Sequence, residues 1–245
     1  MAKNLRQAIP GFSMKKSVRL VVLALVVLGL AITAGPWIYI NLIKDDAPDA
    51  LSLDSVSDQT IPSGVNEETI DDVNGQWRVV PATESVVGYR VKEILFGQST
   101  EGVGRTKEVE ALLTIEDNTV TTGSFTVQMG TLMSDAANRD RQFNNRIMET
   151  AKYPTATFVL DEPIALPDNA ITGETISVTA SGTLTLRGVS KTVTFPLQAQ
   201  VDGAQFQVVG TITIVFDEWG IPEPSVPGIS VEPEGLLEFS LIFSR

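Results

Sequence analysis

The chain has 245 residues, a net charge of −12 and neither cysteine nor histidine. These counts exclude disulfides, zinc sites built on Cys or His, and catalytic triads of the Ser-His or Cys-His type. The acidic balance argues against nucleic-acid binding, because that function needs clustered Lys and Arg to displace counterions. The hydrophobic share of 43% is enough for one domain with a buried core.

The amino-terminal part predicts a membrane anchor. Residues 1–19, a cytoplasmic segment in this interpretation, carry five basic side chains and no acidic one, and residues 20–43 are almost wholly apolar. A helix rising ~1.5 Å per residue over this run is long enough to cross a ~30 Å hydrocarbon core, so we expect a transmembrane helix over 20–43. Basic residues before the span predict a single-pass protein of the cell membrane, with a cytoplasmic amino terminus and an extracytoplasmic carboxy-terminal domain.

A cleaved signal peptide is the alternative interpretation of the same residues. Thr33, Ala34 and Gly35 are small residues at a spacing that a signal peptidase accepts. Cleavage there would make the protein secreted. In both interpretations the main domain lies outside the cytoplasm.

Residues 44–75 predict an acidic, flexible linker. The segment is rich in Asp, Ser, Pro and Gly and has no aromatic residue. It cannot bury enough apolar surface to offset the entropy lost on ordering. We expect it to hold the following domain off the bilayer.

Residues 76–245 predict an all-β domain. Apolar residues recur there at every second position, which is the period of a strand with one buried face. The turn pairs Arg187-Gly188 and Asp202-Gly203 separate long runs of this kind. About eight mostly antiparallel strands in one domain indicate an up-and-down barrel or a sandwich. The runs lie near 87–91, 109–115, 125–129, 156–160, 176–186, 193–201, 206–214 and 237–243.

Residues 135–148 interrupt the alternation with a helical composition. Asp135 can cap the start of such a helix, and Phe143, Ile147 and Met148 would face inward. Tyr153-Pro154 ends the segment, because proline lacks the N–H that a continuing helix needs. The pattern therefore predicts a short helix inserted between two strands.

Several short motifs point to a known family through their order and spacing. They are Trp-Arg-Val at 77–79, Ser-Val-Val-Gly-Tyr-Arg-Val at 85–91, Asn-Arg-Asp at 138–140 with Phe143, Tyr-Pro-Thr-Ala-Thr-Phe at 153–158, and Gly-Thr-Leu-Thr-Leu-Arg-Gly-Val-Ser-Lys at 182–191. From about Gln76 to Ser244 the chain resembles the YceI-like polyisoprenoid-binding proteins. The resemblance implies an eight-stranded antiparallel lipocalin-like barrel whose apolar interior holds a long isoprenoid or another long-chain lipid, without cofactor or metal.

The resemblance also implies that inward apolar side chains line a lipid tube. Packing in a filled core is the alternative for each of them, because every barrel needs this alternation. Arg139 and Arg141 are candidate head-group ligands, since a guanidinium pairs well with phosphate, although a solvated helix face with local ion pairs is the other interpretation. The expected lining residues are Val87, Tyr89, Val91, Phe125, Val127, Phe143, Ile147, Phe158, Leu184, Leu186, Phe195 and Phe206.

Two functions follow from these features. The first is binding of a long-chain isoprenoid or similar amphiphilic lipid in the barrel, with carriage or storage outside the cytoplasmic membrane. The alternative is a non-catalytic structural or interaction module of the cell envelope with a filled barrel. No enzymatic activity is expected, because the histidine that usually activates a nucleophile is missing. Homodimerisation is left open.

Overall fold

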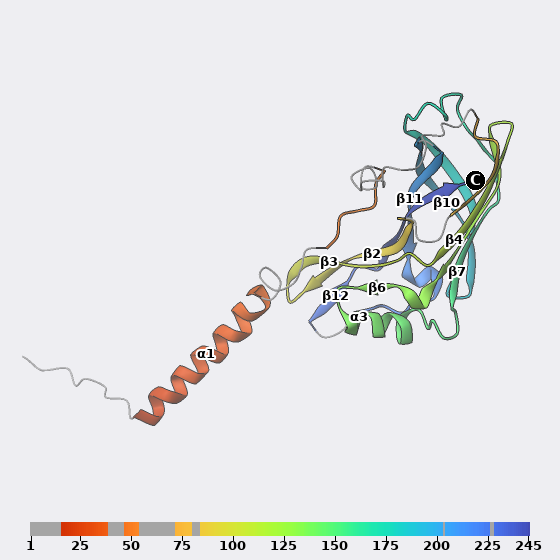
Figure 1. Cartoon of the computed structure of the whole chain (residues 1–245). Coiled ribbons are helices and arrows are strands. Elements are labelled where there is room, and N and C mark those ends of the chain that lie inside the picture. Colours follow the sequence, from red (N-terminus) through yellow and green to blue (C-terminus); the bar gives the residue numbers. More distant parts are fainter. Residues whose placement is uncertain (1–15, 39–46, 54–71, 80–83, 203, 226–227) are drawn as a thin grey trace, which may run out of the picture. The chain divides into compact units, whose positions relative to one another are not determined.

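The computed structural model describes residues 16–38, 47–53, 72–79, 84–202, 204–225 and 228–245 (Figure 1). They belong to two compact units, Met1–Asp45 and Asp46–Arg245. The first unit contains helix α1 (Lys16–Ile38), and the second contains a β-barrel.

Helix α1 is 23 residues long, and its side chains from Leu20 to Leu28 are exposed. Among the described residues, no helix is both long enough and apolar enough to cross a membrane. The prediction of a transmembrane helix over 20–43 is therefore not supported. The apolar run that suggested it differs from the described helix at both ends, since α1 begins with Lys16 and includes Arg19, and residues 39–43 lie outside the described residues.

The second unit confirms the predicted all-β fold. Its strands are β1 (Gly75–Val79), β2 (Val86–Leu95), β3 (Gln98–Thr106), β4 (Val109–Glu116), β5 (Thr119–Gln128), β6 (Met133–Ser134), β7 (Thr155–Leu160), β8 (Ile164–Ala165), β9 (Ile176–Leu186), β10 (Val189–Asp202), β11 (Gln205–Val215), β12 (Ile229–Val231) and β13 (Glu234–Ser244). Eight of them form a closed antiparallel ring in the order β1-β4-β5-β7-β9-β10-β11-β13, because β13 also pairs with β1. Closure of the ring removes the free sheet edges that would otherwise promote aggregation.

Strands β2 and β3 extend the sheet beyond this ring. Strand β2 pairs with β13 over Val86–Arg90, on the same edge that β1 pairs with near the end of β13. Strand β3 pairs with β2 and then with the short strand β6, while β12 pairs with the far end of β2. Strands β2, β3, β6 and β12 thus belong to the same sheet as the ring and lie on one side of the barrel (Figure 1).

The predicted inserted helix is present in two parts. Residues Ala137–Gln142 form helix α3, and Phe143–Ile147 continue it as a π-helical turn, η3. The predicted cap at Asp135 is wrong, because Ala136 occupies the cap position and makes no side-chain cap bond. Instead, the Ser134 backbone N–H and hydroxyl donate to Asp140 Oδ1 at 2.9 and 2.7 Å and fix the helix start. Two 3-10 turns, η2 (Met129–Thr131) and η4 (Phe216–Trp219), complete the domain.

Candidate functional site

The interior of the barrel contains an apolar cavity of about 100 Å³. Eight strands contribute to its wall, and among the lining side chains only Ser124 is polar. A single water needs roughly 10–15 Å³ of such space, so the cavity is several times larger than the space for one water. Because the wall offers no polar partners, the space favours a hydrocarbon over water.

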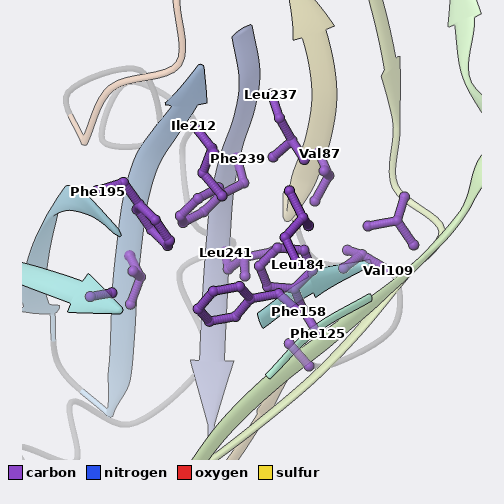
Figure 2. Packing of buried hydrophobic residues seen from close by; sticks show 14 of the residues in the cluster. Val87, Val109, Phe125, Phe158, Leu184, Phe195, Ile212, Leu237, Phe239 and Leu241 are labelled. Carbon is purple, nitrogen blue, oxygen red and sulfur yellow. The ribbon is translucent and has the colours of Figure 1, made fainter. Parts of the chain in front are cut away.

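Four phenylalanines form a closed set of ring contacts across this interior (Figure 2). Phe125 stacks on Phe158 with centroids 5.3 Å apart, and Phe158 meets Phe195 edge-on at 5.5 Å. Phe239 closes the set, at 6.0 Å from Phe195 and 5.8 Å from Phe125. The four rings come from β5, β7, β10 and β13, and all four line the cavity.

Glycines on neighbouring strands make room for two of these rings. A Cβ on Gly182 would lie 2.4 Å from Phe158 Cζ and 2.4 Å from the Val159 carbonyl oxygen. A Cβ on Gly210 would lie 2.5 Å from Phe239 Cζ. A Cβ atom in a folded protein essentially never lies this close to another non-bonded heavy atom. The packing of the four rings therefore depends on glycine at both positions.

The structure divides the predicted lining residues into three groups. Phe125, Phe158, Phe195 and Phe206 line the cavity. Val87, Val127, Leu184 and Leu186 are buried in the surrounding core without reaching the cavity wall. Tyr89, Val91, Phe143 and Ile147 also pack in the core and lie outside that wall, with Tyr89 stacked on Phe143 at 5.1 Å.

Several cavity residues were not in the predicted set. They include Leu113, Val120, Ala180, Ala199, Val208, Phe239, Leu241 and Phe243. The alternation along β13 carried the signal for Phe239, Leu241 and Phe243, because these side chains share one face of the strand. The two alanines gave no signal, since a small apolar residue is equally compatible with a filled core.

A polar cluster surrounds Tyr89 and helix α3. Burial raises the pKa of Tyr89 to about 12, while neighbouring Arg139 acts in the opposite direction. Arg139 Nη2 donates to Glu93 Oε1 at 2.9 Å, and Nη1 pairs with Asp135. Burial alone would lower the pKa of Arg139, but these two carboxylates raise it above its ordinary value. The positive charge of Arg139 is therefore already paired with carboxylates of the protein.

The two head-group candidates occupy different surroundings. Arg139 is half-buried and already bonded to two carboxylates, whereas Arg141 is exposed and donates to the Asn138 side-chain oxygen. Their contact with a lipid head group stays a prediction. Within the described part of the chain, no group of three or more Asp or Glu side chains is placed to hold a metal ion.

Comparison with known proteins gives the family. A model of the YceI-like domain matches residues 77–243, which is 167 of the 245 residues. The chain belongs to the YceI-like family. No curated protein sequence matches it.

Several solved structures are similar to this chain. A polyisoprenoid-binding domain from Saccharophagus degradans, implicated in plant cell wall breakdown, is 15% identical and has a TM-score of 0.54, covering 69% of this chain and 98% of that one. BcnA from Burkholderia cenocepacia is 18% identical with a TM-score of 0.49, covering 64% and 95%. A YceI protein from Campylobacter jejuni is 16% identical with a TM-score of 0.46, covering 58% and 84%.

The most specific YceI-like motif, residues 182–191, has a structural role in this chain. Arg187 and Gly188 form the β9–β10 turn, both with positive φ angles of 50° and 75°. The Arg187 guanidinium donates to Glu149 Oε2 at 2.8 Å and to the Gly220 carbonyl oxygen, so this turn is joined to two other loops. A Cβ on Gly188 would lie 2.6 Å from Tyr153 Cε1, which links this motif to the Tyr-Pro motif.

Proposed function

We propose that this YceI-like barrel binds a long-chain isoprenoid or similar amphiphilic lipid in its interior. The observation that carries the proposal is the apolar cavity bounded by the four phenylalanines. An isoprenoid tail needs no hydrogen-bond partner, and its burial is favourable by roughly 25 cal/mol per Å² of apolar surface. The Saccharophagus degradans neighbour, described as polyisoprenoid-binding, supports the same ligand class.

A long chain occupies more space than the present cavity offers. We therefore expect Phe125, Phe158, Phe195 or Phe239 to change rotamer when such a lipid enters. Such a rotation makes room for the lipid among the aromatic rings. The backbone hydrogen bonds between the strands can therefore stay intact when the lipid enters. No catalytic step is part of the proposal.

Lipid extraction tests the proposal directly. The full chain is purified without detergent and extracted with organic solvent, and the extract is analysed by mass spectrometry. We expect a polyprenyl or other long-chain lipid at a molar ratio approaching one per chain. Delipidated protein should then bind an added polyprenol saturably, with a change in the near-ultraviolet circular dichroism of the phenylalanine rings.

Carriage or storage requires the bound lipid to exchange. Transfer of a fluorescent polyprenol between donor and acceptor vesicles should be faster in the presence of the protein than without it. Bound lipid that leaves only on denaturation would instead indicate a permanent structural ligand.

The contacts among the four rings also favour a second function. A barrel filled by its own aromatic rings serves as a structural or interaction module of the envelope. This function predicts that the purified protein carries no lipid and that delipidated protein binds none. The extraction and titration above therefore distinguish the two functions.

We also propose that the barrel works outside the cytoplasm. Support comes from the basic, apolar and acidic order of the first 72 residues. Alkaline phosphatase fused after Arg245 folds only when exported, so the fusion should be active. An inactive alkaline phosphatase fusion, together with an active fusion to a reporter that works only in the cytoplasm, would contradict this location.

A further inference from the structure

A short segment before the YceI-like domain lies against the outer face of the barrel. Residues 47–53 form neither helix nor strand, yet they belong to the same compact unit as the barrel. They fall within the predicted linker 44–75, of which 54–71 lie outside the described residues. Within this segment the side chain of Leu53 is only 6% exposed.

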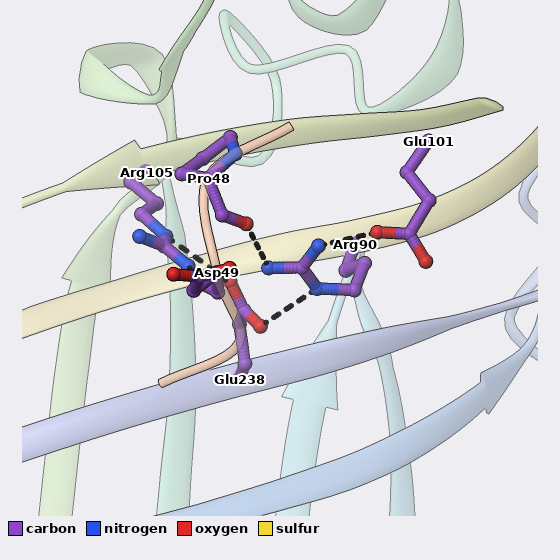
Figure 3. A network of polar contacts seen from close by, with 6 residues as sticks. All are labelled: Pro48, Asp49, Arg90, Glu101, Arg105 and Glu238. Carbon is purple, nitrogen blue, oxygen red and sulfur yellow. Dashed lines mark hydrogen bonds and ion pairs between the residues drawn. The ribbon is translucent and has the colours of Figure 1, made fainter. Parts of the chain in front are cut away.

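The polar contacts come from a buried charge network on three neighbouring strands (Figure 3). Glu238 of β13 has a side chain only 1% exposed and accepts from Arg90 Nε of β2 at 3.2 Å. Arg105 of β3 donates to the other carboxylate oxygen through Nε at 3.1 Å and Nη2 at 2.9 Å. Arg90 Nη1 also pairs with Glu101 at 2.5 Å.

Glycine at position 88 permits this network. Gly88 lies in β2, directly between Glu238 of β13 and Arg105 of β3 in the strand register. The Arg105 side chain crosses over it, because a Cβ on Gly88 would lie 2.9 Å from Arg105 Cγ and 2.3 Å from the Gly104 carbonyl oxygen. The outer surface at this point therefore presents the Arg90 and Arg105 guanidinium groups beside the Glu238 carboxylate.

The guanidinium groups of Arg90 and Arg105 also bind the backbone of residues 47–53. Arg90 Nη2 donates to the Pro48 carbonyl oxygen at 2.7 Å, and Arg105 Nη2 donates to the Asp49 carbonyl oxygen. Two consecutive peptide units are thus held by two different strands. Since the two arginines are balanced by Glu238 and Glu101, the site favours a polarised neutral carbonyl over a second full charge.

We propose that Arg90, Arg105 and Glu238 form a peptide-binding site on the outer face of the barrel, which holds residues 47–53 as a detachable strap. Recognition through main-chain carbonyls makes the site tolerant of sequence. In sequence, residues 39–46 separate α1 from the docked strap, whereas residues 39–71 separate α1 from Asp72 before β1. Docking thus shortens the sequence between α1 and the first residue bound by the barrel from 33 residues to 8.

Thiol labelling tests the strap in the full chain. The protein has no cysteine, so Leu53→Cys introduces a single reactive thiol, and Leu112→Cys is the matched control because Leu112 is 59% exposed. The probe is N-ethylmaleimide, followed by intact-mass spectrometry. We expect Leu53→Cys to react roughly tenfold more slowly than Leu112→Cys, because its thiol becomes accessible only when the strap opens.

Two perturbations should then release the strap. Arg105→Lys keeps a positive charge beside Glu238 but loses the guanidinium fork that also reaches the Asp49 carbonyl. It should raise the labelling rate of Leu53→Cys several-fold and leave that of Leu112→Cys unchanged. A synthetic peptide of residues 46–54, added at millimolar concentration, should do the same by competition. Asp49→Asn should have little effect, because the site binds the carbonyl and not the carboxylate.

Hydrogen exchange of the chain without the introduced cysteine provides an independent readout. Amides of residues 47–53 should exchange more slowly in the wild type than in Arg105→Lys, while circular dichroism shows both proteins folded. The proposal is overturned if Leu53→Cys labels as fast as Leu112→Cys, or if neither Arg105→Lys nor the peptide changes labelling or exchange. In the first case no strap is docked, and in the second it is a fixed part of the fold.

Discussion

Filling the cavity with one larger side chain tests whether the interior of the barrel is hollow. Ala180 lies on β9, is 2% exposed, lines the cavity and pairs across the strands with Phe195. Ala180→Leu adds three carbon atoms at this point. At this position the added volume enters the cavity.

The expected gain follows from the burial of these carbons. Each buried methylene contributes roughly 0.8 kcal/mol, so three contribute at most about 2.4 kcal/mol to the free energy of unfolding. For a domain of this size, 1 kcal/mol corresponds to roughly 2–4 °C in Tm, which gives an increase of up to about 5–10 °C. The same substitution should weaken binding of an added polyprenol, because the leucine occupies its space.

Ala156→Leu is the matched control. Ala156 lies on β7 and is 3% exposed, but it is not part of the cavity wall. The same three carbons are forced into packed core there and should cost about 1–3 kcal/mol. Urea unfolding of both delipidated variants, followed by circular dichroism, measures the difference between them. Equal destabilisation by the two substitutions would refute the reasoning, since it would mean that both alanines face a filled interior.

Three further predictions follow from buried contacts. Gly182→Ala should lower the free energy of unfolding by about 1–3 kcal/mol, whereas Gly123→Ala, whose Cβ meets only the Leu160 side chain at 3.5 Å, should change it by about 0.5 kcal/mol or less in denaturant titrations. Because the folded pKa of Tyr89 is raised to about 12, its contribution to stability is full below pH 10 and is lost as pH rises toward 12. Wild-type protein should therefore lose more stability than Tyr89→Phe between pH 9 and 11.5 in urea titrations, and parallel curves would contradict this assignment. Glu238→Gln should cost roughly 3–5 kcal/mol in the same assay, because it removes the buried carboxylate that the buried Arg90 and the half-buried Arg105 share.

The alternation of apolar residues was sufficient to predict an all-β domain of about eight strands, and its interruption at 135–148 predicted the inserted helix. This signal is local, because side chains in a strand alternate between two faces with a period of two residues whatever the strand pairs with. The choice of a barrel over a sandwich came from the resemblance to the YceI-like family. The start of the helix was predicted less well. Asp135 does not cap the helix, because its carboxylate pairs with Arg139 instead. The helix start is fixed by Asp140, which accepts hydrogen bonds from the Ser134 backbone N–H and hydroxyl.

The cavity residues were only partly predictable for a related reason. Phe125, Phe158 and Phe195 were identified as inward-facing, but alternation does not show whether inward side chains meet. That outcome depends on the volumes of neighbours on other strands, such as the glycines at 182 and 210 that receive the rings of Phe158 and Phe239.

The sequence by itself determined the features that depend on neighbouring residues. These are the strand periodicity, the β9–β10 turn at Arg187-Gly188, and the residues shared with the YceI-like family. Only the tertiary structure decided that β13 closes the ring with β1, and that Glu238 meets two arginines more than 130 positions earlier in the chain. Such contacts join segments that are distant in sequence, and their geometry is set by strand register and packing, for which a local pattern carries no signal.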